Sequence, residues 1–326
     1  RPMKLLRGLH NPPIPDAGCV ATIGNFDGVH LGHQAIVERV IAKAHELGLP
    51  SLVMVFEPQP QEYFRGEQAP ARIMRFRDKF ECLASLKLDY LCVLKFDEYF
   101  RSLTANAFVE QVLCDHIKVT HLVIGDDFRF GGDRQGDFNH LVQSGEKLGF
   151  GVERTETFCT QESCENGERV SSTLIRKALA DGELGDAKAC MGRPFTVSGR
   201  VMYGRQLGRQ LGFPTANVAL KRKHSPVSGV FAVKVDVQTG RHKGAYFGVA
   251  NVGKKPSVGD FEANLEVHLF DFSGDLYGAR VQVELQKKIR EEQRFESVDA
   301  LAEQIQKDNL VAREFAAQQR QPLRLV

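Results

Sequence analysis

Short apolar runs alternate with segments of helical periodicity through the first half of the chain. The runs at residues 19–26, 51–56, 90–95 and 121–124 predict β-strands. Residues 34–47 place their apolar side chains on one face of a helix that Gly48 can end, and a second helix is predicted around residues 105–115. Because strands and helices alternate, we expect a parallel sheet covered by helices on both faces.

Strand-length segments follow one another without intervening helices in the second half. They lie at residues 195–202, 230–237, 245–252, 265–272 and 279–287, and turns carrying Gly or Ser separate most of them. Strands connected in this way pair antiparallel, and their even spacing favours a small closed barrel. A terminal helix at residues 298–317 would turn Leu301, Ile305, Ala312 and Phe315 inward.

The change of pattern predicts two modules. A helical stretch ends near Met191, and Gly192-Arg193-Pro194 opens the first strand of the second half. A chain of 326 residues fits two domains of ordinary size. We therefore expect an α/β module over residues 3–190 and a β-barrel module with a terminal helix over residues 191–326.

Composition narrows the possible partners. The formal net charge of +2 gives no strong field for a nucleic acid or an anionic membrane. The seven cysteines are scattered and form no C-x-x-C pair, which favours reduced thiols over a zinc or disulfide framework. No run approaches the ~20 apolar residues of a membrane span, and no secretory pattern opens the chain. The expectation is a cytoplasmic protein without nucleic-acid or membrane partners.

The segment GNFDGVHLGH at residues 24–33 lies where the first strand turns into the first helix. Ligands of open parallel sheets bind at this edge. Gly24, Gly28 and Gly32 let the backbone approach a phosphate, and the helix N-terminus offers N–H groups to an anion. His30 and His33 can donate to the same phosphate. The alternatives for two histidines at this spacing are a capped surface turn or an accidental metal-binding pair.

Three further segments of the second half carry candidate chemistry. Glycines recur every fourth residue in GRQLGRQLG at residues 204–212, directly before FPTAN at 213–217; no Gly-Lys-Ser/Thr follows, so this is not a Walker loop. Residues 264–272 alternate as a strand, with Glu266 and His268 on one face. The third segment is GVANVGKKPS at residues 248–257. A flexible connection and an exposed strand glutamate are the plainer interpretations of the first two.

Taken in order, these segments resemble the prokaryotic bifunctional riboflavin kinase/FAD synthetases. The H-x-G-H pattern at residues 30–33 is similar to that of Rossmann-like nucleotidyltransferases. Together with IGDDFRFG at 124–131 and SSTLIR at 171–176, it resembles their FMN adenylyltransferase module. The second half resembles the riboflavin kinase barrel of the same family. The resemblance extends over nearly the whole chain.

For the first module the resemblance implies catalytic roles for His30, His33 and Arg176, with Arg176 gripping the leaving pyrophosphate through its planar fork. It implies that Asp127 contacts the flavin. Residues 171–176 would form a phosphate loop, and its hydroxyls could also cap the following helix. The residues expected to bind nucleotide or phosphate here are Gly24, Phe26, Gly28, Gly32, Ser171, Ser172 and Thr173.

For the second module the resemblance implies that Glu266 acts as the base or orienting carboxylate for the flavin hydroxyl. Thr215 and Asn217 would hold Mg²⁺, which prefers hard oxygen ligands of this kind. Arg290 is a candidate flavin contact, and Ser257 replaces a threonine of the family pattern. The residues expected at the nucleotide are Gly204, Gly208, Gly212 and Asn251.

The implied reactions are riboflavin + ATP to FMN + ADP in the second module and FMN + ATP to FAD + pyrophosphate in the first. The implied small-molecule partners are riboflavin, FMN and ATP, and the chain is expected to be a monomer or a weak homo-oligomer. Two alternatives stay open at this point. One is an adenylyltransferase for another phosphorylated metabolite, such as a pantetheine or pyridine nucleotide, and the other is a flavin-binding carrier without turnover.

Overall fold

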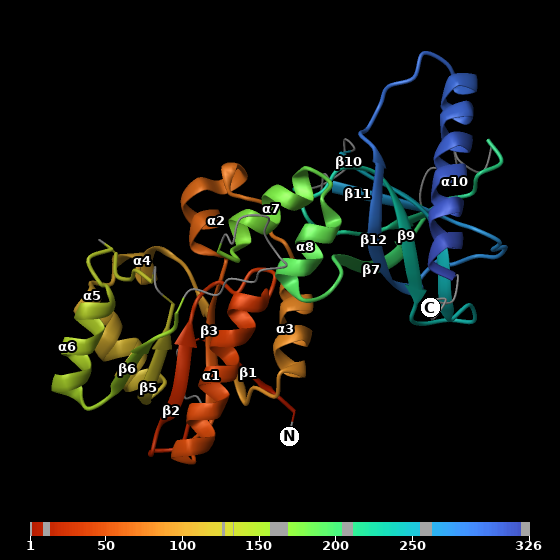
Figure 1. Ribbon diagram of the computed structural model, residues 1–326. Coiled ribbons are helices and arrows are strands. Elements are labelled where there is room, and N and C mark those ends of the chain that lie inside the picture. The colour runs from red at the N-terminus through yellow and green to blue at the C-terminus, as the bar shows by residue number, and fades with distance from the viewer. Residues whose placement is uncertain are drawn as a thin grey trace. The chain divides into compact units, whose positions relative to one another are not determined.

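The computed structural model describes residues 2–8, 14–125, 128–132, 134–156, 169–203, 211–254 and 263–320. Contacts divide the chain into two compact units (Figure 1). The first comprises Arg1–Pro70 and Met74–Ser172, and the second comprises Ala71–Ile73 and Thr173–Val326. Among the described residues, no helix is both long enough and apolar enough to span a membrane.

The first unit is built on a six-stranded sheet with the order β1-β4-β3-β2-β5-β6, in which every neighbouring pair is parallel. The predicted parallel sheet is thus confirmed. The short edge strands β1 and β6 were not predicted, because half-exposed runs of four residues carry little apolar pattern. The strands are β1 (Lys4–Arg7), β2 (Cys19–Ile23), β3 (Ser51–Glu57), β4 (Tyr90–Lys95), β5 (Val119–Ile124) and β6 (Gly151–Arg154).

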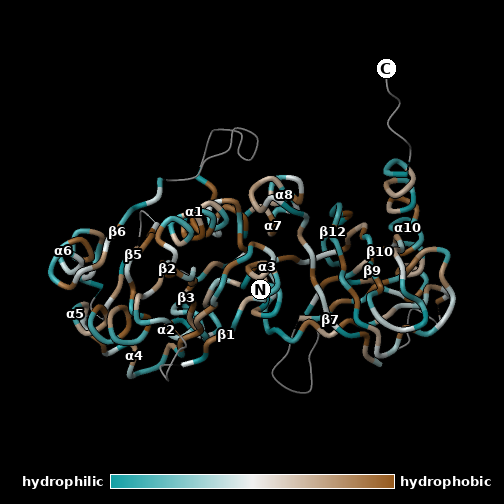
Figure 2. The backbone as a smooth tube through the Cα atoms, turned by 90° about the horizontal axis from the view of Figure 1, so that it is seen from below, coloured by the Kyte–Doolittle hydropathy of each residue, from teal (hydrophilic) through white to brown (hydrophobic). Residues whose placement is uncertain are grey.

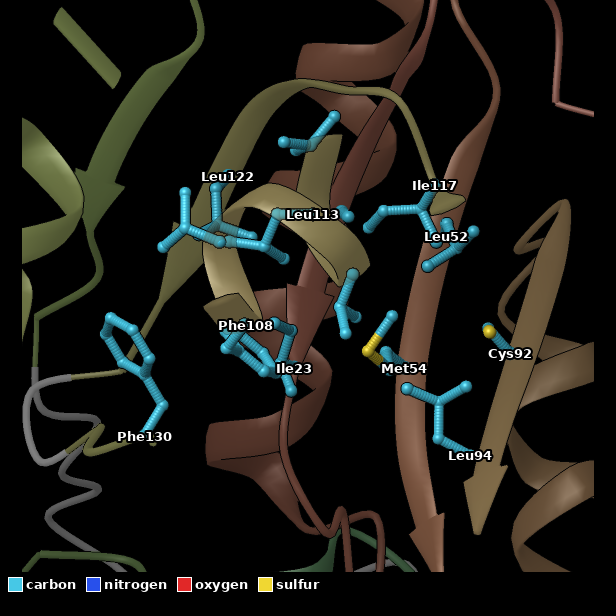
Figure 3. Packing of buried hydrophobic residues seen from close by; sticks show 14 of the residues in the cluster. Ile23, Leu52, Met54, Cys92, Leu94, Phe108, Leu113, Ile117, Leu122 and Phe130 are labelled. Carbon is cyan, nitrogen blue, oxygen red and sulfur yellow. The ribbon is translucent and has the colours of Figure 1, made fainter. Parts of the chain in front are cut away.

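One face of the sheet packs against the helical segment η2 (Phe108–His116). Figure 3 shows Ile23, Met54 and Leu94 on the strands beside side chains of this segment. It winds as a π-helix directly after the short helix α5 (Ala105–Ala107), whereas the sequence pattern predicted one ordinary helix. The apolar pattern predicts a helix but carries no signal for i→i+5 hydrogen bonding, which is rare.

The opposite face packs against α1 (Leu31–Leu47) and α3 (Phe76–Ser85). Alternate residues of β3 serve the two faces, since Met54 packs with η2 and Val53 packs with Val37 of α1. Covering on both sides explains why the central strands read as continuous apolar runs. Figure 2 shows hydrophobic residues along these strands. The remaining helices are α2 (Pro60–Arg65), η1 (Gly66–Gln68), α4 (Glu98–Ser102) and α6 (Phe138–Leu148).

Two thiols lie deep in this core, and desolvation raises the pKa of Cys19 and of Cys92 to about 12. Because the thiolate is the reactive form, we expect both to resist alkylation at neutral pH in the folded protein. The partly exposed Cys82 is the internal comparison. Peptide mapping after brief alkylation should find Cys82 modified and the other two intact until denaturant is added. Equal labelling of all three without denaturant would contradict this packing.

The second unit contains a closed barrel with the strand order β10-β11-β8-β7-β12-β9, and every pair is antiparallel. The predicted antiparallel barrel is therefore confirmed. Strand β8 was not predicted, because it has only three residues and lies inside the FPTAN segment. The strands are β7 (Thr196–Met202), β8 (Ala216–Val218), β9 (Gly229–Val237), β10 (Gly244–Lys254), β11 (Ala263–Leu269) and β12 (Arg280–Arg290).

In the sequence, helices precede and follow the strands of the barrel. α7 (Ser172–Ala180) and α8 (Leu184–Met191) precede it, and the predicted terminal helix is α10 (Val298–Arg320), which packs along β9 and β10 (Figure 1). Ala312 joins a buried cluster with Ala232 and Phe270, and Phe315 packs against that cluster. The inward face expected for this helix is thus present.

Two candidate active sites

The loop between β2 and α1 lies at the carboxyl end of a central strand of the first unit, where ligands of open α/β sheets bind. Its backbone is unusual. Phe26 and Val29 have φ values of 51° and 39°, and Gly28 has φ 89°. Left-handed conformations cost about 1–3 kcal/mol at non-glycine residues and gather at ligand-binding sites. Burial of the Phe26 and Val29 side chains holds the loop in this shape.

The two histidines of this loop cap α1 reciprocally. The backbone N–H of His33 donates to Nδ1 of His30, and the N–H of His30 donates to Nδ1 of His33, both at 3.2 Å. The rings stack with centroids 3.5 Å apart, and His30 is only 6% exposed. Since each Nδ1 accepts, the proton of each neutral ring is on Nε2. Both rings therefore offer an Nε2–H donor at the N-terminus of α1.

This geometry bears on the plainer interpretation of the two histidines, a capped surface turn. The pair does cap a helix, and the same capping fixes both rings in the form whose Nε2 is a donor. Two such donors beside a helix N-terminus are suited to an anion, because the helix dipole and the ring N–H groups have the same polarity. Phe26 packs its ring 4.9 Å from that of His33 and is buried, so only its backbone can face a nucleotide.

Segment 171–176 reaches the same loop at one point. The hydroxyl of Ser172 donates to the carbonyl oxygen of Asp27 at 2.9 Å, and buried Asp27 accepts the backbone N–H of Met74 through Oδ1 at 3.2 Å. Arg176 donates from Nε to the carbonyl of Ala71 at 2.7 Å. Contacts of Ser171, Ser172, Thr173 and Arg176 with phosphate stay predictions.

The remaining glycines of the loop fit a tight backbone. A Cβ at Gly24 would lie 3.2 Å from the ring of Phe26, and Gly32 falls in the first turn of α1. Asp127, Gly204 and Gly208 lie outside the described residues, as does Ser257. Gly212 is described, with φ 82°.

An aromatic cluster that the sequence analysis did not single out lies beyond the ends of β3 and β4. The rings of Tyr63, Phe64 and Phe96 lie with centroids 5.3–5.6 Å apart, and Phe64 is 56% exposed. Phe56 and Phe100 extend the cluster into the core. The sequence signal for this cluster was the presence of aromatic residues shortly after the ends of two consecutive strands, β3 and β4. The cluster offers an apolar surface for a planar ring at the sheet edge that carries the β2–α1 loop.

In the barrel, strand register brings three predicted site residues into one row. Glu266 of β11 lies directly opposite Asn217 of β8 and, on its other side, opposite Asn251 of β10. Directly opposed residues of antiparallel strands have Cβ atoms roughly 4.5–5.5 Å apart on the same face. A carboxylate is therefore flanked by two amides, and all three can act on one ligand.

A cavity of about 380 Å³ adjoins this row. Its walls include Thr215, Asn251, Glu266 and Arg290, so four residues singled out from separate segments share one site. On the side of α10, Leu301 and Ile305 line it. The Thr215 hydroxyl, the Asn217 amide oxygen and the Glu266 carboxylate are hard oxygen donors of the kind that Mg²⁺ takes.

Contacts of His268 and of two glycines explain the local sequence around the row formed by Asn217, Glu266 and Asn251. His268 donates from Nδ1 to the carbonyl of Pro214 at 2.7 Å, which holds the segment just before Thr215. A Cβ at Gly248 would collide with the carbonyl of His268, and one at Gly253 with the carboxylate of Glu292. These two glycines of the 248–257 segment therefore permit close backbone approach rather than unusual backbone angles.

Arg290 makes contacts that the sequence analysis did not foresee. Its Nε lies 3.0 Å from both carboxylate oxygens of Asp308, and its Nη2 lies 2.9 Å from Oδ2. Nη1 donates to the carbonyl of Glu291 at 3.0 Å. Asp308 on α10 is 2% exposed, so this is a buried ion pair that ties the end of β12 to the terminal helix. No sequence signal marked Asp308, because an aspartate within a helix is ordinarily solvated.

Comparison with known proteins covers both units. A family model described as FAD synthetase matches residues 13–174, and one described as riboflavin kinase matches residues 191–316. A bifunctional riboflavin kinase/FMN adenylyltransferase of Escherichia coli (strain K12) is 50% identical over 314 residues, which cover 96% of this chain and 98% of that protein. A protein of the same name from Haemophilus influenzae is 48% identical over 313 residues, covering 96% and 99%. A crystal structure of a protein from Streptococcus pneumoniae, named there as a macrolide-efflux protein, matches with a TM-score of 0.78 at 30% identity and covers 95% of this chain and 98% of that one.

Proposed function

The chain belongs to the bifunctional riboflavin kinase/FMN adenylyltransferases, and from this premise we propose how its residues divide the two reactions. The FAD synthetase part adenylylates FMN to FAD, and the riboflavin kinase part phosphorylates riboflavin to FMN. We assign residues 3–190 to the first module and 191–326 to the second. The riboflavin kinase match begins at residue 191, whereas the FAD synthetase match ends at residue 174 and contacts group residues 173–190 with the barrel. Riboflavin, FMN and ATP are the substrates, and we place the enzyme in the cytoplasm, where ATP is abundant and thiols stay reduced.

In adenylylation, a phosphate oxygen of FMN attacks the α-phosphorus of ATP, and pyrophosphate leaves. The reciprocal capping of His30 and His33 supports a role for their Nε2–H groups as donors to the nucleotide phosphates. Such donors stabilise the charge that develops on the phosphate oxygens in the transition state. Arg176 is the candidate for the leaving pyrophosphate, because a guanidinium can bind two phosphate oxygens at once.

The aromatic edge formed by Tyr63, Phe64 and Phe96 is the candidate surface for the flavin ring in this module. Its support is the exposure of Phe64 beyond the carboxyl end of β3, which neighbours β2 in the sheet. The guanidinium of Arg101 lies over the same ring, 5.6 Å from its centroid. A planar conjugated ring gains from offset stacking on such a side chain. Asp127 keeps its assignment as a flavin contact from the sequence.

In the kinase module, the row Asn217–Glu266–Asn251 is the observation that carries the assignment. Glu266 accepts the proton of the terminal flavin hydroxyl as that oxygen attacks the γ-phosphate of ATP, and Asn251 orients the nucleotide. Thr215 and Asn217 would hold Mg²⁺, which neutralises phosphate charge during transfer when bound. Gly212, the last glycine of the 204–212 segment, keeps its assignment to the nucleotide. Arg290 remains the candidate flavin contact, because its ion pair with Asp308 forms one wall of the cavity.

The Asp308→Asn substitution tests this cavity. It leaves the half-buried guanidinium of Arg290 without its carboxylate, and breaking a buried pair commonly costs about 3–5 kcal/mol. Because the pair fixes one wall of the cavity, we expect the KM for riboflavin to rise about tenfold or more, since tenfold is only ~1.4 kcal/mol. Steady-state phosphorylation of riboflavin measures this.

Adenylylation of supplied FMN is the internal control in the same sample and should not change. Glu303→Gln, on the exposed side of the same helix, is the matched control for losing one carboxylate from α10. A wild-type KM for riboflavin in folded Asp308→Asn protein would contradict a wall built by this ion pair.

A further inference from the structure

A fully buried lysine lies beneath the β2–α1 loop. Lys79 on α3 is 0% exposed, and its Nζ donates to the carbonyl oxygen of Asn25 at 2.7 Å. Lysine is almost never fully buried without a polar partner, because its ammonium must be removed from water. An apolar side chain could fill the same volume among the residues of this face, which include Leu83 and Phe26. Packing alone therefore does not explain why a charged residue occupies this position.

The contact fixes the direction of one peptide plane. The carbonyl of Asn25 and the N–H of Phe26 belong to the same planar trans peptide unit and point in opposite directions. Since the Asn25 carbonyl turns inward to the ammonium, the N–H of Phe26 turns away from the lysine. This peptide precedes the left-handed Phe26, and the second left-handed residue, Val29, follows directly before His30.

Other contacts of this loop come from different elements. Asp27 is held by the N–H of Met74, and its carbonyl receives the hydroxyl of Ser172. Lys79 adds a charge-assisted hydrogen bond at the start of the loop, and such bonds are roughly twice as strong as neutral ones. A loop with two unfavourable backbone conformations needs anchors of this kind if it is to keep one shape without a ligand.

We propose that Lys79 is a positioning residue for adenylylation: its buried ammonium holds the Asn25 carbonyl inward, so that the Phe26 N–H and the chain leading to His30 keep the conformation that receives the ATP phosphates. The proposal rests on the assignment of adenylylation to the first module. Lys79 acts through the backbone of the loop and touches neither substrate.

Lys79→Met tests the proposal, because methionine fills similar space without the charge. We expect kcat/KM for ATP in FAD formation from FMN to fall about 100-fold, the loss typical of a misplaced reacting group, with a higher KM for ATP. Phosphorylation of riboflavin by the same protein should equal that of the wild type. Lys147→Met, on the exposed side of α6, controls for exchanging a lysine in this unit.

The possible outcomes distinguish a failure of this proposal from a failure of the assignment of adenylylation to the first module. Wild-type protein that forms no FAD would refute the assignment of adenylylation itself. If wild-type protein is active and folded Lys79→Met keeps its KM for ATP and its rate, Lys79 has no positioning role. A lower rate with an unchanged KM for ATP would support the proposal if the folded fraction equals that of the wild type, because the lost interaction then belongs to the transition state. A lower rate that only follows a smaller folded fraction would refute it. If Lys79→Met does not fold, Lys79→Gln replaces it, and wild-type adenylylation by that shorter neutral donor would show that the ammonium is not needed.

Discussion

Replacing His30 by alanine is expected to abolish FAD formation from FMN while riboflavin phosphorylation continues unchanged. The substitution removes an Nε2–H donor aimed at the nucleotide phosphates, and losing one such donor typically lowers kcat by about 10²–10³. It also removes the N-cap acceptor of α1, which costs about 0.5–2 kcal/mol of stability, and the ring against which His33 stacks. The rates of FAD formation from FMN and of FMN formation from riboflavin, measured on one preparation, give the two activities.

His30→Asn separates the two roles of this residue. Asparagine is a good N-cap but offers no donor at the position of Nε2, so it should restore the melting temperature and not the activity. If His30→Asn forms FAD at the wild-type rate, capping is the function of His30 and the phosphate role is wrong. Equal loss of FAD and FMN formation in His30→Ala would contradict two independent sites.

Glu266→Ala is expected to have the reverse effect. Phosphorylation of riboflavin should fall by about 10²–10⁴, the range for removing a positioned general base, while FAD still forms from supplied FMN. The physical reason is the place of Glu266 between Asn217 and Asn251 at the wall of the cavity, where no other described carboxylate has the same register. Separate assays with riboflavin and with FMN as the starting flavin measure the two rates.

Two controls sharpen this experiment. Glu266→Gln keeps the size and hydrogen-bonding capacity of the side chain, so a loss as large as in the alanine variant would assign the effect to the carboxylate charge. Glu284→Gln, on β12 of the same barrel, tests whether removing any strand carboxylate disturbs the module. Near-wild-type phosphorylation by Glu266→Gln would show that Glu266 is not the base.

The sequence predicted most of the fold because the buried elements carry strong patterns. Central strands such as β3 are covered on both faces and read as continuous apolar runs, and the barrel strands alternate. The missed strands, β1, β6 and β8, are three or four residues long, and the helices α2, α3, α4 and α6 were not predicted either. The pairing of these strands depends on neighbours distant in the sequence, which a local pattern does not contain.

The candidate sites were predictable as residue types but not as geometry. The glycine-flanked His30 and His33 indicated phosphate binding, yet their mutual capping follows only from the backbone of the loop. Likewise, the register that places Glu266 between two asparagines depends on three strands meeting. Lys79 and Asp308 lacked any signal, because a charged residue in a helical segment is usually exposed and their burial arises from tertiary packing.

A chromatographic time course of purified protein with riboflavin, ATP and Mg²⁺ tests whether one chain carries both activities. We expect FMN to appear first and FAD to follow, with no other reagent needed. FMN without FAD would contradict the role of the first module and direct attention to other phosphorylated acceptors. Flavin binding with no turnover would rule out both assigned activities and favour a carrier.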